Sequence, residues 1–398
     1  VNLLLLRGNI GKPGAGICPV RGHSNVQGQR TVGITEDPAK VPGQKLQALF
    51  GVQVPPNKGM ATVDCCQALV EGKVKAFIGL GGNFLRAIPD TQCMEAAWQT
   101  LTLNVQVATK LNRTHLFPGR HGWLLPCLGH IEADRQEGVE QVYTTEDSTG
   151  CIRAWQGRNE PASEHLRSEV AIIAGLAEAT LDQRTTVDWD AWRHDYALIR
   201  EAISQVYPEI FHNMETRMWE HGGFHRPLPA AKREWQTPSG KAQFVAPQRL
   251  DEDDDLQPAV SAHDVLQLMT LRSNDQFNTT VYGYDDRFRG VKGTRSVVFL
   301  NRSDVVRLGL AAGDWVLLRT AVEPQVVREV GPLQIIAYDI PEGCAGAYYP
   351  ECNPLIPLWH HAERSKVPAA KCVPVTLHKV EPRASDLSKA VPAHDQIN

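Results

Sequence analysis

The chain has 398 residues, enough for two or more domains that each bury a core. Its 41 basic and 45 acidic residues give a net charge of −4, and no basic stripe with interleaved aromatic residues occurs, which argues against nucleic acid as a partner. Nine scattered cysteines without a CxxC pair predict reduced thiols in a cytoplasmic protein, and they argue against a disulfide framework and against a zinc or iron–sulfur site within the chain.

The opening run VNLLLL (1–6) is too short for a membrane span or a signal-peptide core, and we expect no membrane span in the chain. The run reads as the end of a helix, and it begins with Val1 rather than Met. We therefore interpret the sequence as a fragment of a longer polypeptide.

A glycine-rich loop follows at 8–28, GNIGKPGAGICPVRGHSNVQG. Glycine has no Cβ, so such a loop lets a large ligand approach its backbone closely. Arg21, His23 and several amide side chains lie among the glycines and are suited to bind that ligand. Residues 29–59 carry four prolines and show no sustained periodicity, which predicts extended connecting structure.

Apolar runs then alternate with helical patterns. These patterns predict helices at 60–72 and 90–101, and strands at 75–84, 103–108, 122–127 and, more weakly, 141–145. Strands that alternate with helices favour an α/β fold with a parallel sheet, whose ligands lie beyond the carboxyl ends of the strands. We expect that ligand edge to be formed by the turns at 81–83, 109–114 and 146–148.

The turn GLGGNF invites comparison with a nicotinamide-binding motif but differs from it. Pro89 delays the helix that should follow immediately, and residues 100–108 contain no acidic side chain to bind a ribose. An NAD-dependent dehydrogenase is therefore the weaker alternative.

In the second half of the chain, the alternation of strands and helices ends. Amphipathic helices are expected at 164–181 and 189–206, a hairpin at 235–245, and an acidic linker at 251–262. Short strands follow at 265–272, 296–301, 314–320, 328–339 and 373–380, with a short helix at 308–314. This spacing predicts a small closed β barrel, followed by a disordered tail from residue 383.

Several segments in the same order resemble one family, the molybdopterin-dependent oxidoreductases whose alpha subunits are similar to formate dehydrogenase. The segments are LLLLRGNIGKPGAGICPVRGHSNVQG, KAFIGLGGNF, THLFPGRHGWLLPCLGHIEAD, TPSGKAQF, LRSNDQF, AYYPECNPLIP and SKVPAAKCVPV. The resemblance implies a fold built around two molybdopterin guanine dinucleotides with molybdenum, of which this chain supplies the carboxy-terminal half.

The domains that the resemblance implies run consecutively along the chain. They are a loop and connecting segment at 1–59, an α/β nucleotide-binding domain at 60–250, the linker at 251–262, a barrel of the aspartate-decarboxylase-like, double-psi type at 263–382, and the tail at 383–398. The implied cofactor contacts are Gly81, Asn83, Thr109 and Thr114 in the α/β domain, and Arg272, Gln276, Asn353 and Lys371 in the barrel.

In relatives the residue that matches Arg21 faces the substrate, so the resemblance implies catalytic roles for Arg21 and for His23 nearby. A guanidinium suits a small anion and an imidazole can carry a proton. His23 departs from the glutamine usual in formate dehydrogenases, which puts formate itself in doubt as the substrate.

The family's metal ligand and any 4Fe–4S cluster would lie upstream of Val1, so this chain alone would be inactive, and we expect no metal ligand within it. The other function left open is a freestanding nucleotide-binding module without turnover. The sequence leaves the electron acceptor, the direction of the reaction and the oligomeric state open.

Overall fold

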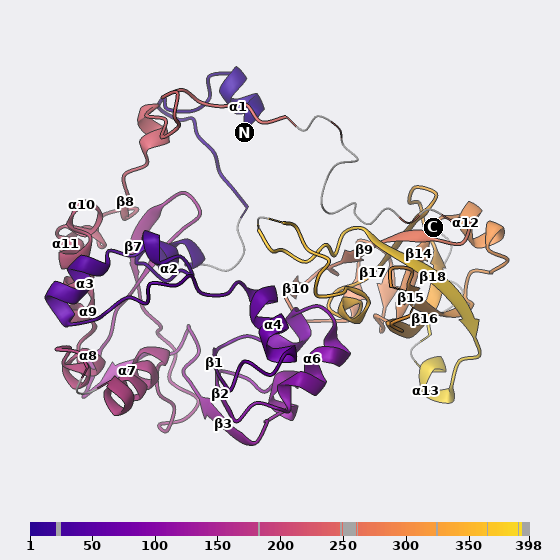
Figure 1. Cartoon of the computed structure of the whole chain (residues 1–398), viewed down its shortest axis with the longest axis horizontal. Helices are drawn as coiled ribbons and strands as arrows, with labels where there is room; N and C mark the ends of the chain where they lie inside the picture. Colours follow the sequence, from indigo (N-terminus) through magenta and orange to yellow (C-terminus); the bar gives the residue numbers. More distant parts are fainter. Residues whose placement is uncertain are drawn as a thin grey trace. The chain divides into compact units, whose positions relative to one another are not determined.

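The computed structural model describes residues 1–20, 25–181, 184–246, 249, 260, 262–323, 325–363, 365–388 and 390–391. Its contacts divide the chain into two compact units, each assembled from separate stretches (Figure 1). Unit 1 consists of Val1–Met60 and Pro126–Ala246, and unit 2 of Ala61–Leu125 and Pro247–Asn398. Residues 61–125 and 126–246 thus lie in different compact units, while the domain boundaries expected from the sequence stay a prediction.

A small sheet forms the first part of unit 2. Strands β1 (Ala76–Leu80) and β2 (Leu103–Ala108) are parallel, and β3 (His121–Pro126) completes the order β1-β2-β3. The core beside this sheet is formed by α4 (Thr62–Val70) and α6 (Thr91–Trp98), and the Trp98 ring lies 4.6 Å from the ring of Phe77 in β1. The predicted parallel pairing and both predicted helices are confirmed.

The second part of unit 2 is a closed barrel of six strands in the order β14-β16-β15-β18-β9-β17. The strands are β9 (Leu266–Leu271), β14 (Val297–Leu300), β15 (Trp315–Thr320), β16 (Glu329–Ala337), β17 (Cys344–Tyr348) and β18 (Val373–Val380). Alternate residues point inward, so that Leu266, Leu268, Val316 and Leu318 are completely buried in the barrel core. The predicted barrel is confirmed.

Two details of the barrel differ from the expectation. Strand β17 was not predicted because its sequence, CAGAY, consists mostly of small residues; a Cβ on Gly346 would lie 2.8 Å from the Leu271 side chain. The helix expected at 308–314 is wrong. Helix α12 (Arg302–Arg307) precedes it, capped by the Asn301 side chain, and Gly309 follows with a φ of 66°.

Unit 1 contains a second, antiparallel sheet. Strand β6 (Tyr143–Glu146) pairs with β7 (Cys151–Trp155), which pairs with β8 (Phe224–His225). A tight turn connects β6 to β7, because the Asp147 carboxylate accepts the N–H groups of Thr149 and Cys151. The expectation that residues 146–148 line the edge of the parallel sheet is therefore wrong.

The helices of unit 1 follow the predictions in part. Helix α7 (Glu169–Leu181) lies within the predicted 164–181, but the helix expected at 189–206 is two helices, α8 (Trp189–His194) and α9 (Tyr196–Val206). The Asp195 side chain caps α9 and thereby separates it from α8. Residues 29–59 are not extended throughout, because α3 (Gly43–Phe50) lies among them.

No strand occurs at 235–245, so the predicted hairpin is wrong. The Thr237 hydroxyl instead donates a hydrogen bond to the Lys241 carbonyl. The smaller elements are α1 (Asn2–Leu6), α2 (Val26–Thr31), η1 (Pro38–Lys40), α5 (Phe84–Ala87), η2 (Arg113–Leu116), β4 (Arg135–Gln136), β5 (Val139–Glu140), α10 (Pro208–Phe211), α11 (Met214–Arg217), η3 (Pro229–Lys232), β10 (Gln276–Phe277), β11 (Thr280–Val281), β12 (Asp285–Asp286), β13 (Val291–Lys292), η6 (Asn353–Leu355) and α13 (Ala384–Leu387).

The structure describes only part of the predicted linker and of the predicted tail. Most of the predicted acidic linker (251–262) lies outside the described residues, as do 392–398 of the predicted tail. Helix α13 begins that tail, so its first residues are helical rather than disordered. Within the described ranges, no helix has the length and apolar character needed to cross a membrane.

The sheet and barrel of unit 2 are tied by a buried ion pair, which we expect to be important for stability. Arg328 donates to Asp90, before α6, and to Glu323, both at 2.9 Å. In Arg328→Leu the Asp90 carboxylate would lose its partner while buried, and we expect a loss of about 3–5 kcal/mol, measured by urea unfolding. The control Arg319→Leu breaks an exposed pair with Glu329 and should cost only about 0–1 kcal/mol. Equal losses in the two variants would contradict this role.

Candidate functional site

The first part of the candidate site is the turn after β1. Gly81 and Gly82 both have positive φ angles, 71° and 83°, which favour glycine over residues with a side chain. The Gly81 N–H donates to the Val107 carbonyl at 2.8 Å, so β1 stays paired with β2 up to the turn. The turn therefore lies where the parallel strands end, as the sequence predicted.

Two side chains from the next loop hold this turn in place. Asn112 donates to the Gly82 carbonyl at 2.9 Å. The Thr114 hydroxyl accepts the Leu85 N–H and donates to Asn83 Oδ1, both at 3.1 Å, and Thr114 is completely buried. Thr114 thus supports Asn83 from the interior and Thr109 is exposed, while cofactor contacts of both threonines stay predictions.

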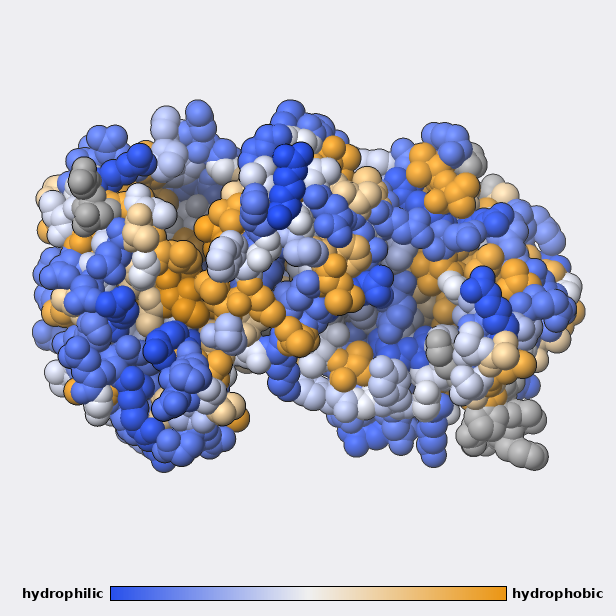
Figure 2. Space-filling view, turned by 90° about the horizontal axis from the view of Figure 1, so that it is seen from below, coloured by the Kyte–Doolittle hydropathy of each residue, from blue (hydrophilic) through white to orange (hydrophobic). Residues whose placement is uncertain are grey.

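This arrangement fixes the orientation of the Asn83 amide. Because Oδ1 accepts from Thr114, Nδ2 is the side of the amide that remains available, and no described residue accepts a hydrogen bond from it. Leu80 directly precedes the turn and Leu111 directly precedes Asn112, and they are 50% and 79% exposed. Figure 2 shows that patches of apolar residues, in orange, interrupt the hydrophilic surface of the face in view. An available amide donor suits the polar edge of a heterocyclic ring.

The second part of the site lies on the barrel, after strands β9 and β17. The Arg272 guanidinium lies 5.3 Å from the Tyr349 ring centroid, and the Lys371 ammonium donates to the Thr270 carbonyl. Partial burial and the nearby guanidinium lower the pKa of Lys371. Two cations held close together favour an anionic ligand.

Both ends of the Gln276 amide form hydrogen bonds within the protein. Its Oε1 accepts the Ser273 N–H at 2.9 Å, and its Nε2 donates to the Tyr349 and Asn278 carbonyls at 2.7 and 2.8 Å. The amide thus shapes the loop at 273–278, and contact with a cofactor stays a prediction for this residue.

Asn353 links the two parts of the site. Its side chain is buried and donates from Nδ2 to the Arg86 carbonyl at the end of α5, at 2.6 Å. Its own carbonyl accepts the Asp90 N–H at 3.1 Å. The barrel segment at 349–353 therefore extends from the Arg272 region to the turn that carries Asn83, although a cofactor contact of Asn353 itself stays a prediction.

Arg295, which the sequence analysis missed, holds the barrel loops together. It is 7% exposed, binds Glu351 through Nε and Nη2 at 2.6 and 3.0 Å, and donates to the Tyr349 carbonyl at 2.7 Å. It also donates to Ser273 Oγ at 2.6 Å. A lone arginine between threonine and serine gave no sequence signal, because its partners lie 22 to 56 residues away.

The glycine-rich loop belongs to unit 1, and the predicted catalytic residues Arg21 and His23 lie outside the described residues. The part that follows them is anchored on the end of β6. Asn25 accepts the Glu146 N–H at 3.0 Å, and the buried Gln27 donates to the Glu146 carbonyl at 2.9 Å. Gly28 is required here, since a Cβ would lie 2.1 Å from Asn25 Oδ1.

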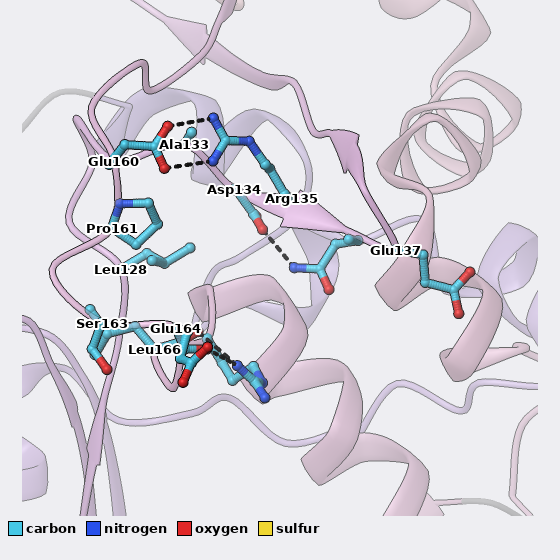
Figure 3. Close-up of a pocket in the computed structure, with 12 residues that line it drawn as sticks. Leu128, Ala133, Asp134, Arg135, Glu137, Glu160, Pro161, Ser163, Glu164 and Leu166 are labelled. Atoms are coloured by element: carbon cyan, nitrogen blue, oxygen red, sulfur yellow. Dashed lines mark hydrogen bonds and ion pairs between the residues drawn. The ribbon is translucent and has the colours of Figure 1, made fainter.

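A hollow of about 560 Å³ lies elsewhere in unit 1 (Figure 3). Several of its charged groups already have partners: Arg135 binds both carboxylate oxygens of Glu160 at 2.9 Å, and Asp134 accepts from Gln136 and from the hydroxyls of Tyr143 and Tyr196. None of the predicted site residues lines it. We therefore assign no ligand to this hollow.

Within the described residues, no cluster of three or more histidine, cysteine, aspartate or glutamate side chains is arranged to bind a metal ion.

The architecture, a parallel α/β sheet together with a closed six-stranded barrel, defines a fold that occurs in solved enzymes. Acetylene hydratase from Pelobacter acetylenicus superposes with a TM-score of 0.57 at 17% identity, over 87% of this chain and 51% of that chain. This likeness shows the fold. No family model matches the sequence.

Proteins that are similar in sequence carry more specific names. An uncharacterized oxidoreductase of Mycobacterium tuberculosis is 45% identical over 385 residues, 94% of this chain and 48% of its own length. A putative formate dehydrogenase of Bacillus subtilis, YrhE, is 37% identical over 91 residues, 20% of this chain and 9% of its own length. The chain is thus similar throughout to a protein named an oxidoreductase, and it spans about half of that relative's length.

We expect the contacts of Arg295 to order the barrel loops of the site. In Arg295→Met the partly exposed Glu351 carboxylate loses its partner and the loops lose their shared donor, at a cost of about 1–3 kcal/mol. Hydrogen exchange should become faster at 273–278 and 349–353, whereas strand β7 in unit 1 serves as the internal control. Unchanged exchange in both loops would contradict this assignment.

Proposed function

We propose that the chain is the carboxy-terminal part of a molybdenum oxidoreductase similar to formate dehydrogenase. The enzyme would oxidise or reduce a small substrate by two electrons at a bis-molybdopterin guanine dinucleotide centre in the cytoplasm, and the barrel would be of the double-psi type. The oxidoreductase name of the M. tuberculosis relative, the formate dehydrogenase name of YrhE and the fold shared with acetylene hydratase support this proposal.

One observation carries the proposal furthest. Two segments that the motifs assign to a single cofactor, around Asn83 and around Asn353, are joined in one compact unit by the hydrogen bond from Asn353 to Arg86, across 267 residues of sequence. A sheet turn and a barrel loop that meet in this way suit an elongated ligand with chemically different ends.

The residues present fit such a cofactor. Asn83 Nδ2 is an available donor beside the backbone of Gly81, as a guanosine requires. Arg272 and Lys371 lie close together, and neither forms an ion pair with a described carboxylate, so a diphosphate would neutralise both. When bound, the cofactor supplies a metal on dithiolene sulfurs that exchanges two electrons with the substrate. The chain's residues bind and orient it.

The proposed contacts with the substrate are those of Arg21 and His23. We propose that the Arg21 guanidinium binds an anionic or oxo group of the substrate and that a His23 ring nitrogen accepts or returns its proton. The hydrogen bonds of Asn25 and Gln27 to Glu146 would anchor the chain directly after Arg21 and His23.

The test of the function is the cofactor content of the intact gene product. We expect acid hydrolysis to release about two GMP for each molybdenum, measured by chromatography and by elemental mass spectrometry. Two dinucleotides and one metal per protein are what the proposed centre requires. A folded, full-length protein that contains neither would contradict the proposal.

The role of Arg21 has a separate test in the intact enzyme. Arg21→Ala should lower kcat/KM by at least 100-fold, because the substrate anion loses a charged partner worth about 3 kcal/mol. Molybdenum and GMP contents should stay near those of the wild type. The exposed Arg158→Ala serves as the control and should change neither quantity. Loss of molybdenum in proportion to activity would show that Arg21 is structural.

A further inference from the structure

The barrel loop at 272–276 contains a buried amide without a partner. Asn274 is 5% exposed, and its Oδ1 is buried with no hydrogen-bond partner. No described residue accepts from its Nδ2 either; the only polar contact of Asn274 in the described structure is from its backbone N–H to Asp286, at 3.4 Å. An unpaired buried amide costs about 1–3 kcal/mol, so the fold retains this side chain at a cost.

The surroundings of Asn274 are those of the candidate site. Arg272 lies two residues before it on the Tyr349 ring, and Gln276 lies two residues after it. Neighbouring polar groups have partners: Gln276 uses both ends of its amide, and Ser273 is bound by Arg295. Asn274 therefore differs from Ser273 and Gln276, whose side chains hold the shape of the loop.

Strand geometry places this loop beside the second barrel loop. Strands β9 and β17 are parallel, with Leu271 opposite Tyr348, so the loops that follow both strands leave the barrel at the same end. Arg295 bridges them through Ser273 and Glu351. Asn274 thus belongs to the same end of the barrel as Arg272 and Tyr349.

We propose that Asn274 binds the fused-ring part of the ligand, through a ring edge on which a carbonyl and an N–H are adjacent. An asparagine amide offers one acceptor and one donor side by side, and such a lactam edge, present in guanines and pterins, offers the complementary pair. This inference rests on the proposed function and adds a ligand-contacting residue to it. Arg272 and Lys371 would then bind the anionic part of the same ligand.

The test compares the cofactor-free chain with the intact protein. Leucine resembles asparagine in shape but has no polar atoms, so Asn274→Leu removes an unsatisfied amide and should leave the melting temperature of the cofactor-free chain unchanged or raised. In the intact protein the same variant should lower the pterin and GMP contents at least tenfold.

The matched control lies four residues further on. Asn278 accepts a hydrogen bond from the Tyr349 hydroxyl at 2.7 Å, so Asn278→Leu should lower the melting temperature of the cofactor-free chain. A similar fall in Asn274→Leu would show a structural role and overturn the proposal. Normal cofactor content in Asn274→Leu would also overturn it, while a wild-type protein without pterin, GMP and molybdenum would instead contradict the proposed function.

Discussion

The structure of unit 2 depends on how the barrel satisfies the end of a very short helix. Helix α5 has four residues, so its last carbonyl groups have no partners within the helix. Asn353 supplies one donor, to the Arg86 carbonyl, and in return its own carbonyl accepts the Asp90 N–H. Because buried backbone groups must be paired, the turn at 81–83 and the barrel loops keep a defined geometry.

The same principle separates residues that hold the site from residues available to a ligand. The polar atoms of Thr114 and Gln276 form hydrogen bonds with neighbouring backbone and side-chain groups. Asn83 Nδ2 and the Asn274 amide have no described partner. Both groups of residues lie in the segments that the motifs single out, so satisfaction of hydrogen bonds, rather than motif membership, distinguishes their roles.

Local patterns predicted regular elements better than connections. The apolar runs that became β1, β2, β9, β14, β15, β16 and β18 are continuous in sequence and were identified correctly. The expectations failed where one polar side chain or one close contact decides the outcome. Asp195 divides a helix by capping its second half, and Asn301 starts a helix earlier than the apolar pattern indicates.

The sequence by itself determined the strands of the parallel pair and of the barrel and the segments that resemble molybdopterin-dependent oxidoreductases, because each strand and each motif consists of residues close together in the chain. Only the tertiary structure decided that β6 belongs to an antiparallel sheet, that Arg295 bridges two loops, and that Asn274 is left without a partner. The pairing of β7 with β8 and the contacts of Arg295 join residues far apart in sequence, and the burial of Asn274 depends on the surrounding fold, so no local pattern reveals them.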